Sequence, residues 1–96
     1  MDRQPSHPGA LLREIVLPET GLTVTQLANT CGLARNTVSK IVNERGDITE
    51  DIAIRLSRAL GSTPEFWLGM QAKYNLWMLA QENQAEYKKI KRVEAA

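Results

Sequence analysis

The chain has 96 residues, and 12 Lys and Arg against 11 Asp and Glu give it a formal net charge of +1. A chain of this length forms one small domain, and its near-neutral charge argues against histone-like bulk binding of nucleic acid. One cysteine excludes an intramolecular disulfide framework and a cysteine-based zinc site. Because no apolar run approaches a membrane span or a signal peptide, we expect a soluble, cytoplasmic domain without membrane contact.

Residues 1–7 form a polar leader, and the first predicted helix follows it. Pro8 suits the first turn of a helix, where the missing backbone N–H has no helical partner in any case. Pro18 and Gly21 are expected to end this helix. Its apolar face consists of Leu11, Leu12, Ile15 and Val16.

Two short helices separated by a glycine turn are predicted next. Thr23 is a good N-cap for the first of them, and Gly32 fits the left-handed position that follows a helix end. The second runs from about Arg35 to Asn43. The apolar face of the first is Val24, Leu27, Ala28 and Cys31.

Two more helices complete the expected fold, which is all-α with five helices. Thr49 caps a fourth helix that ends at Gly61, and Thr63 caps a long fifth helix with no later breaker. Residues 8–72 are expected to form the domain, and residues 73–96 to extend the fifth helix. The basic tail either continues that helix or frays, and we favour a frayed end.

Acidic residues are missing from the middle of the chain. Residues 24–46 contain no acid before Glu44, and residues 23–45 carry a net charge of +2. On a helical wheel, the third helix separates its apolar side chains from a polar arc. Bases and amides on such an arc match base edges and phosphates, whereas a carboxylate would be repelled by DNA. The alternative is an ordinary amphipathic helix with a solvated face. The polar arc is Arg35, Asn36, Ser39, Lys40 and Asn43.

The preceding helix favours the DNA-binding alternative. Two crossing helices need a small residue where they touch and a glycine at the turn, and Ala28 and Gly32 supply them. Leu33, Val38 and Ile41 are spaced to fill the crevice between the two helices. This is the spacing of a helix-turn-helix, whose second helix enters the major groove.

The same residues resemble a known family. Residues 21–60 resemble the Cro/repressor-type (XRE) helix-turn-helix family, which implies a lambda-repressor-like fold of five helices with the third reading DNA. Residues 7–77 more narrowly resemble the HigA antitoxin family, also called VapI-like. The similar segments are HPGALLREIVLPETGLT, NTVSKIVNERGDITEDIAIRLSRALG and STPEFWLGMQAKYNL.

The sequence departs from the family pattern at three positions. Ala10 stands where the family usually has Glu, and Glu44 stands where Gly often follows Asn. Ala34 stands where Ser or Pro is common, and it leaves the third helix without a side-chain N-cap, at a cost of about 1 kcal/mol. None of the three lies on the polar arc.

The resemblance implies a type II antitoxin. Such a protein forms a homodimer, binds palindromic double-stranded operator DNA, represses its own operon and neutralises a HigB-type mRNA-cleaving toxin. The residues themselves point only to DNA reading, and the toxin partner rests on the resemblance. The operator sequence and the toxin-contact surface stay open.

Individual roles follow by analogy with repressor complexes. Base reading is expected from Arg35, Asn36, Ser39 and Lys40. Arg35 is suited to a bidentate contact with guanine and Asn36 to one with adenine, each contributing about 1–3 kcal/mol of discrimination. Phosphate contacts are expected from Thr23, Thr25, Gln26, Thr37, Asn43 and Arg45. For each of these residues, the alternative is a helix cap or a solvated polar side chain.

The expected fifth helix is apolar on two sides, so it needs two surfaces to pack against. Its own core is one, and a partner subunit is the expected second, although packing within one chain stays open. Such a dimer would present two reading helices about 34 Å apart on a palindrome. The predicted dimer interface is Phe66, Trp67, Met70, Tyr74, Trp77 and Met78, and the other side carries Leu68, Ala72, Leu76 and Leu79.

Three functions compete: an autorepressing antitoxin, a stand-alone repressor without a toxin, and an interaction module that does not touch DNA. The carboxylate-free third helix argues against the last. An enzyme is not expected, because there is no phosphate loop, nucleophile–base pair or metal-ligand spacing, and no cofactor is expected either. Cys31 is expected in the core, and His7 has no partner histidine or cysteine for a metal.

Overall fold

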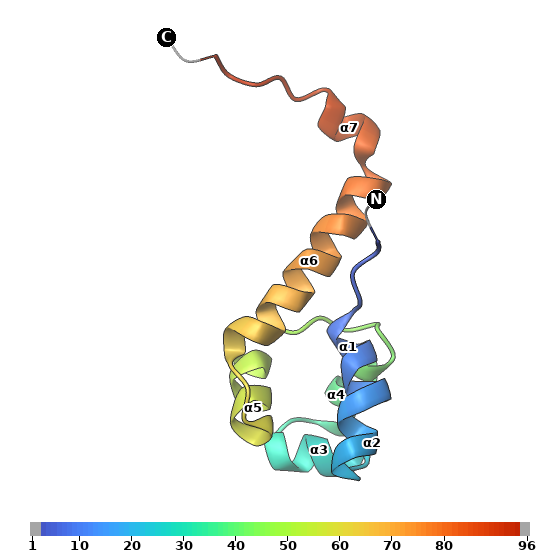
Figure 1. Cartoon of the computed structure of the whole chain (residues 1–96), viewed down its shortest axis with the longest axis vertical. Coiled ribbons are helices and arrows are strands. Elements are labelled where there is room, and N and C mark those ends of the chain that lie inside the picture. Colours follow the sequence, from blue (N-terminus) through green and yellow to red (C-terminus); the bar gives the residue numbers. More distant parts are fainter. Residues whose placement is uncertain (1–2, 95–96) are drawn as a thin grey trace.

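The computed structural model describes residues 3–94, and all the regular structure in them is helical, which confirms the all-α prediction. The helices pack into a small body from which the last long helix projects (Figure 1). In chain order the elements are α1 (Pro8–Leu11), the π-helical turn η1 (Leu12–Val16), α2 (Leu17–Thr20), α3 (Val24–Cys31), α4 (Arg35–Val42), α5 (Glu50–Leu60), α6 (Pro64–Glu82) and α7 (Gln84–Lys88).

The first predicted helix is α1, η1 and α2 in one uninterrupted run, and its predicted end at Gly21 is confirmed, whereas Pro18 does not end it. The Leu17 N–H donates to the Leu12 carbonyl, which is the wider five-residue spacing of a π-helix. Proline within a regular α-helix clashes with the carbonyl four residues earlier, and a wider turn just before it relieves that clash. The run therefore continues to Gly21, which has a left-handed φ of 72°.

The predicted helix caps are confirmed. The Thr23, Thr49 and Thr63 hydroxyls each accept a hydrogen bond from the backbone N–H three residues later, at 3.1, 3.3 and 3.2 Å. Gly32 ends α3 with a left-handed φ of 67°. Ala34, at the start of α4, makes no side-chain cap, as expected.

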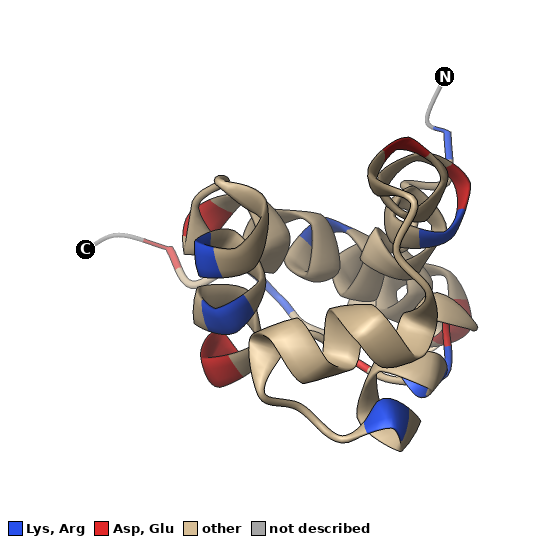
Figure 2. Cartoon of the chain, turned by 90° about the horizontal axis from the view of Figure 1, so that it is seen from below, with Lys and Arg blue, Asp and Glu red and all other residues tan. Residues whose placement is uncertain are grey.

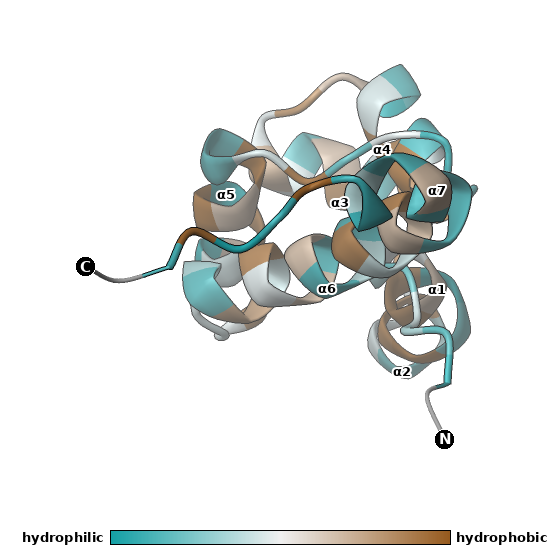
Figure 3. Ribbon diagram, turned by 90° about the horizontal axis from the view of Figure 1, so that it is seen from above, coloured by the Kyte–Doolittle hydropathy of each residue, from teal (hydrophilic) through white to brown (hydrophobic). Residues whose placement is uncertain are grey.

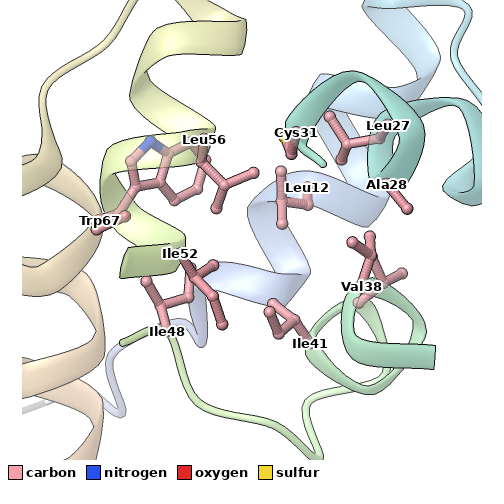
Figure 4. Close-up of a cluster of buried hydrophobic side chains, with 12 residues drawn as sticks. Leu12, Leu27, Ala28, Cys31, Val38, Ile41, Ile48, Ile52, Leu56 and Trp67 are labelled. Carbon is pink, nitrogen blue, oxygen red and sulfur yellow. The ribbon is translucent and has the colours of Figure 1, made fainter. Parts of the chain in front are cut away.

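The core lies between η1, α3, α4, α5 and the first turns of α6 (Figure 4). Cys31 is buried in it, as predicted, and burial raises the pKa of its thiol while the nearby Arg55 acts in the opposite direction. The core side chains are Leu12, Leu27, Ala28, Cys31, Val38, Ile41, Val42, Ile48, Ile52, Ala53, Leu56 and Trp67.

Trp67 belongs to this core, which corrects its assignment to the dimer interface. Its side chain is 2% exposed, and its indole N–H donates to the Ser62 hydroxyl at 2.8 Å. The first turns of α6 lie on α5, and Trp67 is on the side of the helix that faces the domain, whereas Phe66 beside it is exposed. The sequence pattern alone could not distinguish this direction from an outward one.

The leader is not a free segment, because its last part lies along α6 (Figure 1). His7 is 2% exposed, and its ring packs edge-on against Tyr74, with ring centroids 4.9 Å apart. The Gln4 side-chain amide reaches the Met78 sulfur at 3.7 Å. Two members of the predicted dimer interface, Tyr74 and Met78, are therefore partly covered by the chain's own N-terminal segment.

The second half of α6 projects away from the body, and the described residues span 54 × 25 × 24 Å. α6 ends at Glu82, α7 follows, and residues 90–94 have no regular structure. Hydrophobic residues, brown in Figure 3, recur along the projecting part of α6 and in the tail. Among residues 3–94, no helix combines the length and apolar character needed to cross a membrane.

Candidate nucleic-acid interface

α3 and α4 form the helix-turn-helix that the spacing predicted. Ala28 is fully buried where the helices cross, and its carbonyl accepts from the Leu33 N–H at 2.9 Å. Val38 and Ile41 point from α4 into the core, as Figure 4 shows. These contacts fix the angle of α4 and leave its opposite face to solvent.

The start of α3 is held by a reciprocal cap. The Thr23 hydroxyl accepts from the Gln26 N–H, and the Gln26 side-chain oxygen accepts from the Thr23 N–H at 2.9 Å. Both side chains therefore have a structural role. The first N–H groups of a helix have no intrahelical acceptor, so those of Val24 and Thr25 are open to an anion such as a phosphate.

The outer face of α4 brings the predicted base-reading residues together. Arg35, Asn36 and Lys40 are exposed, and Ser39 is half-buried beside them. Figure 2, in which Asp and Glu are red, shows no red on α3 or α4. The Arg35 Nε donates to the Thr25 hydroxyl at 2.9 Å, which links the starts of the two helices. The face offers cationic and amide donors without a competing carboxylate.

The chain folds back after α4 and keeps the last predicted contacts near this face. The Asn43 side-chain amide donates to the Ser39 carbonyl at 2.9 Å, so it caps the end of α4. The N–H groups of Arg45 and Gly46 both donate to the Lys40 carbonyl, at 2.8 and 3.1 Å. This brings exposed Arg45 to the end of α4. Thr37 is only half-exposed and lies within α4 itself.

Similar proteins share this arrangement. The chain matches the helix-turn-helix family HTH_3 over residues 12–68. It is 42% identical to the antitoxin HigA-1 of Vibrio cholerae serotype O1 over 89 residues, which cover 93% of this chain and 84% of that protein. The chain belongs to the HigA family of helix-turn-helix antitoxins.

Solved structures agree with this family membership. The structure of the antitoxin GraA is 39% identical, with a TM-score of 0.91 over 96% of this chain and all of that one. GraA in complex with its operator is 38% identical, with a TM-score of 0.90, and the match covers 99% of this chain and 97% of that one. These HigA-type proteins are not enzymes, which agrees with the sequence prediction.

Glu44 is one of the three positions at which the sequence departs from the pattern that the resemblance implies, and its backbone conformation suits the expected glycine. Glu44 has a left-handed φ of 61°, a conformation that glycine adopts without strain. Its carboxylate is bound by Arg13 at 3.0 Å, and the same guanidinium donates to the Val42 carbonyl at 2.6 Å. Arg13 therefore both caps α4 and neutralises the one acid of the stretch 24–46.

Sequence reasoning missed the role of Arg55. Its Nε binds the Asp51 carboxylate at 3.0 Å. Its Nη1, however, also donates to the carbonyls of Cys31 and Gly32, at 3.0 and 3.3 Å. Arg55 therefore caps the end of α3 from α5. The Asp–Arg spacing of four residues signals the ion pair, but nothing local signals the carbonyls.

The HPG opening, His7–Gly9, lies against α4. The His7 Nδ1 accepts from the Gly9 N–H at 2.9 Å, and Pro8 starts α1. A methyl group on Gly9 would overlap the Ile41 carbonyl, so only glycine allows α1 to approach α4 this closely. Burial lowers the pKa of His7 despite the opposing fields of Glu44 and Asp47. Among the described residues, no group of metal-ligating side chains is suited to hold an ion.

Proposed function

We propose that this chain is a DNA-binding antitoxin that reads a palindromic operator as a homodimer, represses its own operon and neutralises a HigB-type toxin. The observation that supports DNA reading is the exposed face of α4, where basic and amide side chains stand without a carboxylate. The similarity to GraA, which has been solved with its operator, supports the same role. A repressor acts on the chromosome, so the proposal includes a cytoplasmic location.

In this proposal, α4 enters the major groove and reads bases with Arg35, Asn36, Ser39 and Lys40. Phosphates are contacted by Arg45, Thr37 and the N–H groups at the start of α3. Thr23, Gln26 and Asn43 contribute by holding helix ends, since their side chains are occupied there. Thr25, also expected to contact a phosphate, binds the Arg35 guanidinium instead.

The test of DNA reading starts from the DNA that the wild-type protein selects from a random pool. Arg35→Ala combined with Asn36→Ala should reduce the preference for this site over unrelated DNA by about 2 kcal/mol or more. Circular dichroism should show an intact fold, because both side chains are exposed. Arg58→Ala combined with Gln81→Ala removes one charge and one amide elsewhere and should leave the preference unchanged. An unaltered preference in the α4 variant would contradict the assignment.

The proposed dimer uses the half of α6 that projects from the body. Leu76 is 67% exposed and Leu79 is also exposed, while Trp77 on the adjoining side is half-buried. Phe66 and Met70 lie nearer the body and extend the predicted stripe, whereas Trp67 is withdrawn from it. An apolar surface of this kind at the end of a helix favours association.

Leu76→Glu and Trp77→Ala test the two sides of α6 separately, because the two residues lie about 100° apart around the helix. The variant at the true interface should sediment as a monomer and bind the selected palindrome more weakly, because one reading helix contacts only half of it. If both variants sediment as unaltered dimers, the interface lies on another part of the surface.

Toxin neutralisation rests on membership of the HigA family. When the toxin is expressed from the small reading frame adjacent to the gene for this chain, co-expression of this chain should restore growth of the cells, and the two proteins should co-purify. If the chain binds its selected DNA but neither rescues growth nor co-purifies with that product, it is a stand-alone repressor.

A further inference from the structure

We propose that Thr25 controls base specificity by orienting Arg35, rather than by contacting a phosphate as its position first suggested. This inference rests on the proposed reading of DNA by α4, and it assigns to a residue of α3 the placement of the reading arginine. Thr25 is thus a positioning residue that acts through Arg35.

The geometry joins the first turn of α3 to the first residue of α4. The Arg35 Nε lies 2.9 Å from the Thr25 Oγ1, and the guanidinium N–H is the donor. Thr25 lies within the capping box that Thr23 and Gln26 form, so its backbone is fixed. A β-branched side chain also has few rotamers, which makes its hydroxyl a rigid support.

The chemistry of this bond leaves the reading edge of Arg35 free. A guanidinium has five N–H donors, and the bond to Thr25 occupies only the one on Nε. The two terminal nitrogens remain as a planar fork, which matches the O6 and N7 acceptors of guanine in the major groove.

A comparison of the arginines supports a different role for Arg35. The Arg13 and Arg55 guanidiniums each bind a carboxylate and a backbone carbonyl, and both stabilise helix ends. Within residues 3–94, Arg35 binds a neutral hydroxyl instead of a carboxylate. The Arg35 guanidinium is therefore held in place, and no carboxylate of the described residues compensates its charge.

Orientation matters because a free arginine side chain loses rotamer freedom when it binds. A side chain already held near its bound conformation loses less of that freedom, so affinity for the matching base increases. The gain applies only to the guanine that Arg35 reads, and contacts with phosphates elsewhere are unaffected. Thr25 should therefore change preference between sequences and not binding to DNA in general.

The experiment uses the full chain and the DNA site that the wild-type protein selects. Affinity is measured for this site, for versions with each guanine replaced by adenine, and for unrelated DNA. Arg35→Ala should abolish the preference for one guanine in each half-site. Thr25→Val, which removes the hydroxyl at nearly constant shape, should reduce the preference for the same guanine about threefold to tenfold.

Two variants serve as controls. Thr25→Ser keeps a hydroxyl and should retain most of the preference. Thr30→Val makes the same chemical change on exposed α3, where the hydroxyl bonds only to the Gln26 carbonyl, and it should have no effect. Thermal unfolding should be nearly unchanged in all of them, because these side chains are exposed.

The outcomes separate this inference from the function on which it rests. An equal loss on all DNA sequences in Thr25→Val would make Thr25 a phosphate contact and overturn the inference. The same would follow if Thr25→Val had its full effect in the Arg35→Ala background. If Arg35→Ala itself leaves every guanine preference intact, the proposed reading by Arg35 fails, and the inference fails with it.

Discussion

At the scale of the residue, His7 shows how one side chain ties several parts of the chain together. Its Nδ1 caps α1, its ring packs on Tyr74 of α6, and it lies two residues before the glycine that touches α4. The cap requires an unprotonated Nδ1, so the neutral form of His7 is built into the fold. Protonation would break the cap and place a charge in a buried position.

His7 predicts a loss of stability in mild acid. Because burial lowers its folded-state pKa, the folded protein binds fewer protons than the unfolded chain, so stability falls as pH drops below the unfolded value of about 6.5. His7→Asn retains a capping oxygen without a titrating group, and it should unfold with a weaker dependence on pH between about 7 and 5. Urea denaturation at several pH values measures this. Parallel pH curves for the two proteins would contradict the prediction.

At the scale of the element, the helix-turn-helix is held from outside by side chains of other helices. Arg13 caps the end of α4, and Arg55 caps the end of α3. Gln71 of α6 is 4% exposed, and its side-chain oxygen accepts from the Ile48 N–H at 2.8 Å while its amide reaches Asp47. The loop after α4 is thus fastened to α6. These bonds restrict α3 and α4 to one mutual arrangement.

Arg55→Ala should lower the free energy of unfolding by about 1 kcal/mol, because the carbonyls of Cys31 and Gly32 lose their donor. Arg58→Ala removes the same charge from an exposed position on the same helix and should have a much smaller effect. Chemical denaturation of both variants makes the comparison. Equal effects would mean that the charge of α5 matters and the cap does not.

Trp67→Ala should act on folding rather than on association. The indole is a core side chain, so its removal should lower the free energy of unfolding by about 3–5 kcal/mol. Sedimentation under conditions that keep the variant folded should show the oligomeric state of the wild type. A stable variant that has become monomeric would return Trp67 to the interface.

At the scale of the whole molecule, the chain consists of a packed body and a projecting arm. The last buried side chain is that of Gln71, and the described residues beyond it are half-buried or exposed. The second half of α6, α7 and the tail carry exposed apolar side chains such as those of Leu76, Ile90 and Val93. The body supports α4, and the arm leaves apolar side chains exposed.

Deletion of residues 84–96 should leave the free energy of unfolding of the body within about 0.5 kcal/mol of the full chain, because no core side chain is removed. Chemical denaturation at a low protein concentration tests this without a contribution from association. A larger loss of stability would show that α7 or the tail packs on the body.

Much of this protein follows from interactions between residues close in sequence. The caps by Thr23, Thr49 and Thr63 and the left-handed Gly32 need only neighbours within a few positions, so the helices and the helix-turn-helix spacing could be predicted. The polar arc of α4 follows in the same way from helical periodicity. All of these depend on local backbone geometry, which a sequence pattern expresses directly.

Only the tertiary structure decided what depends on residues far apart in the chain. The direction of Trp67, the burial of His7 against Tyr74 and the cap of α3 by Arg55 each join helices separated by many residues. The passage of the helix through Pro18 depends on a π-turn, which no residue type announces. Periodicity shows that a helix has two apolar sides, but which side is buried depends on how the helices pack, and that is set by the fold as a whole.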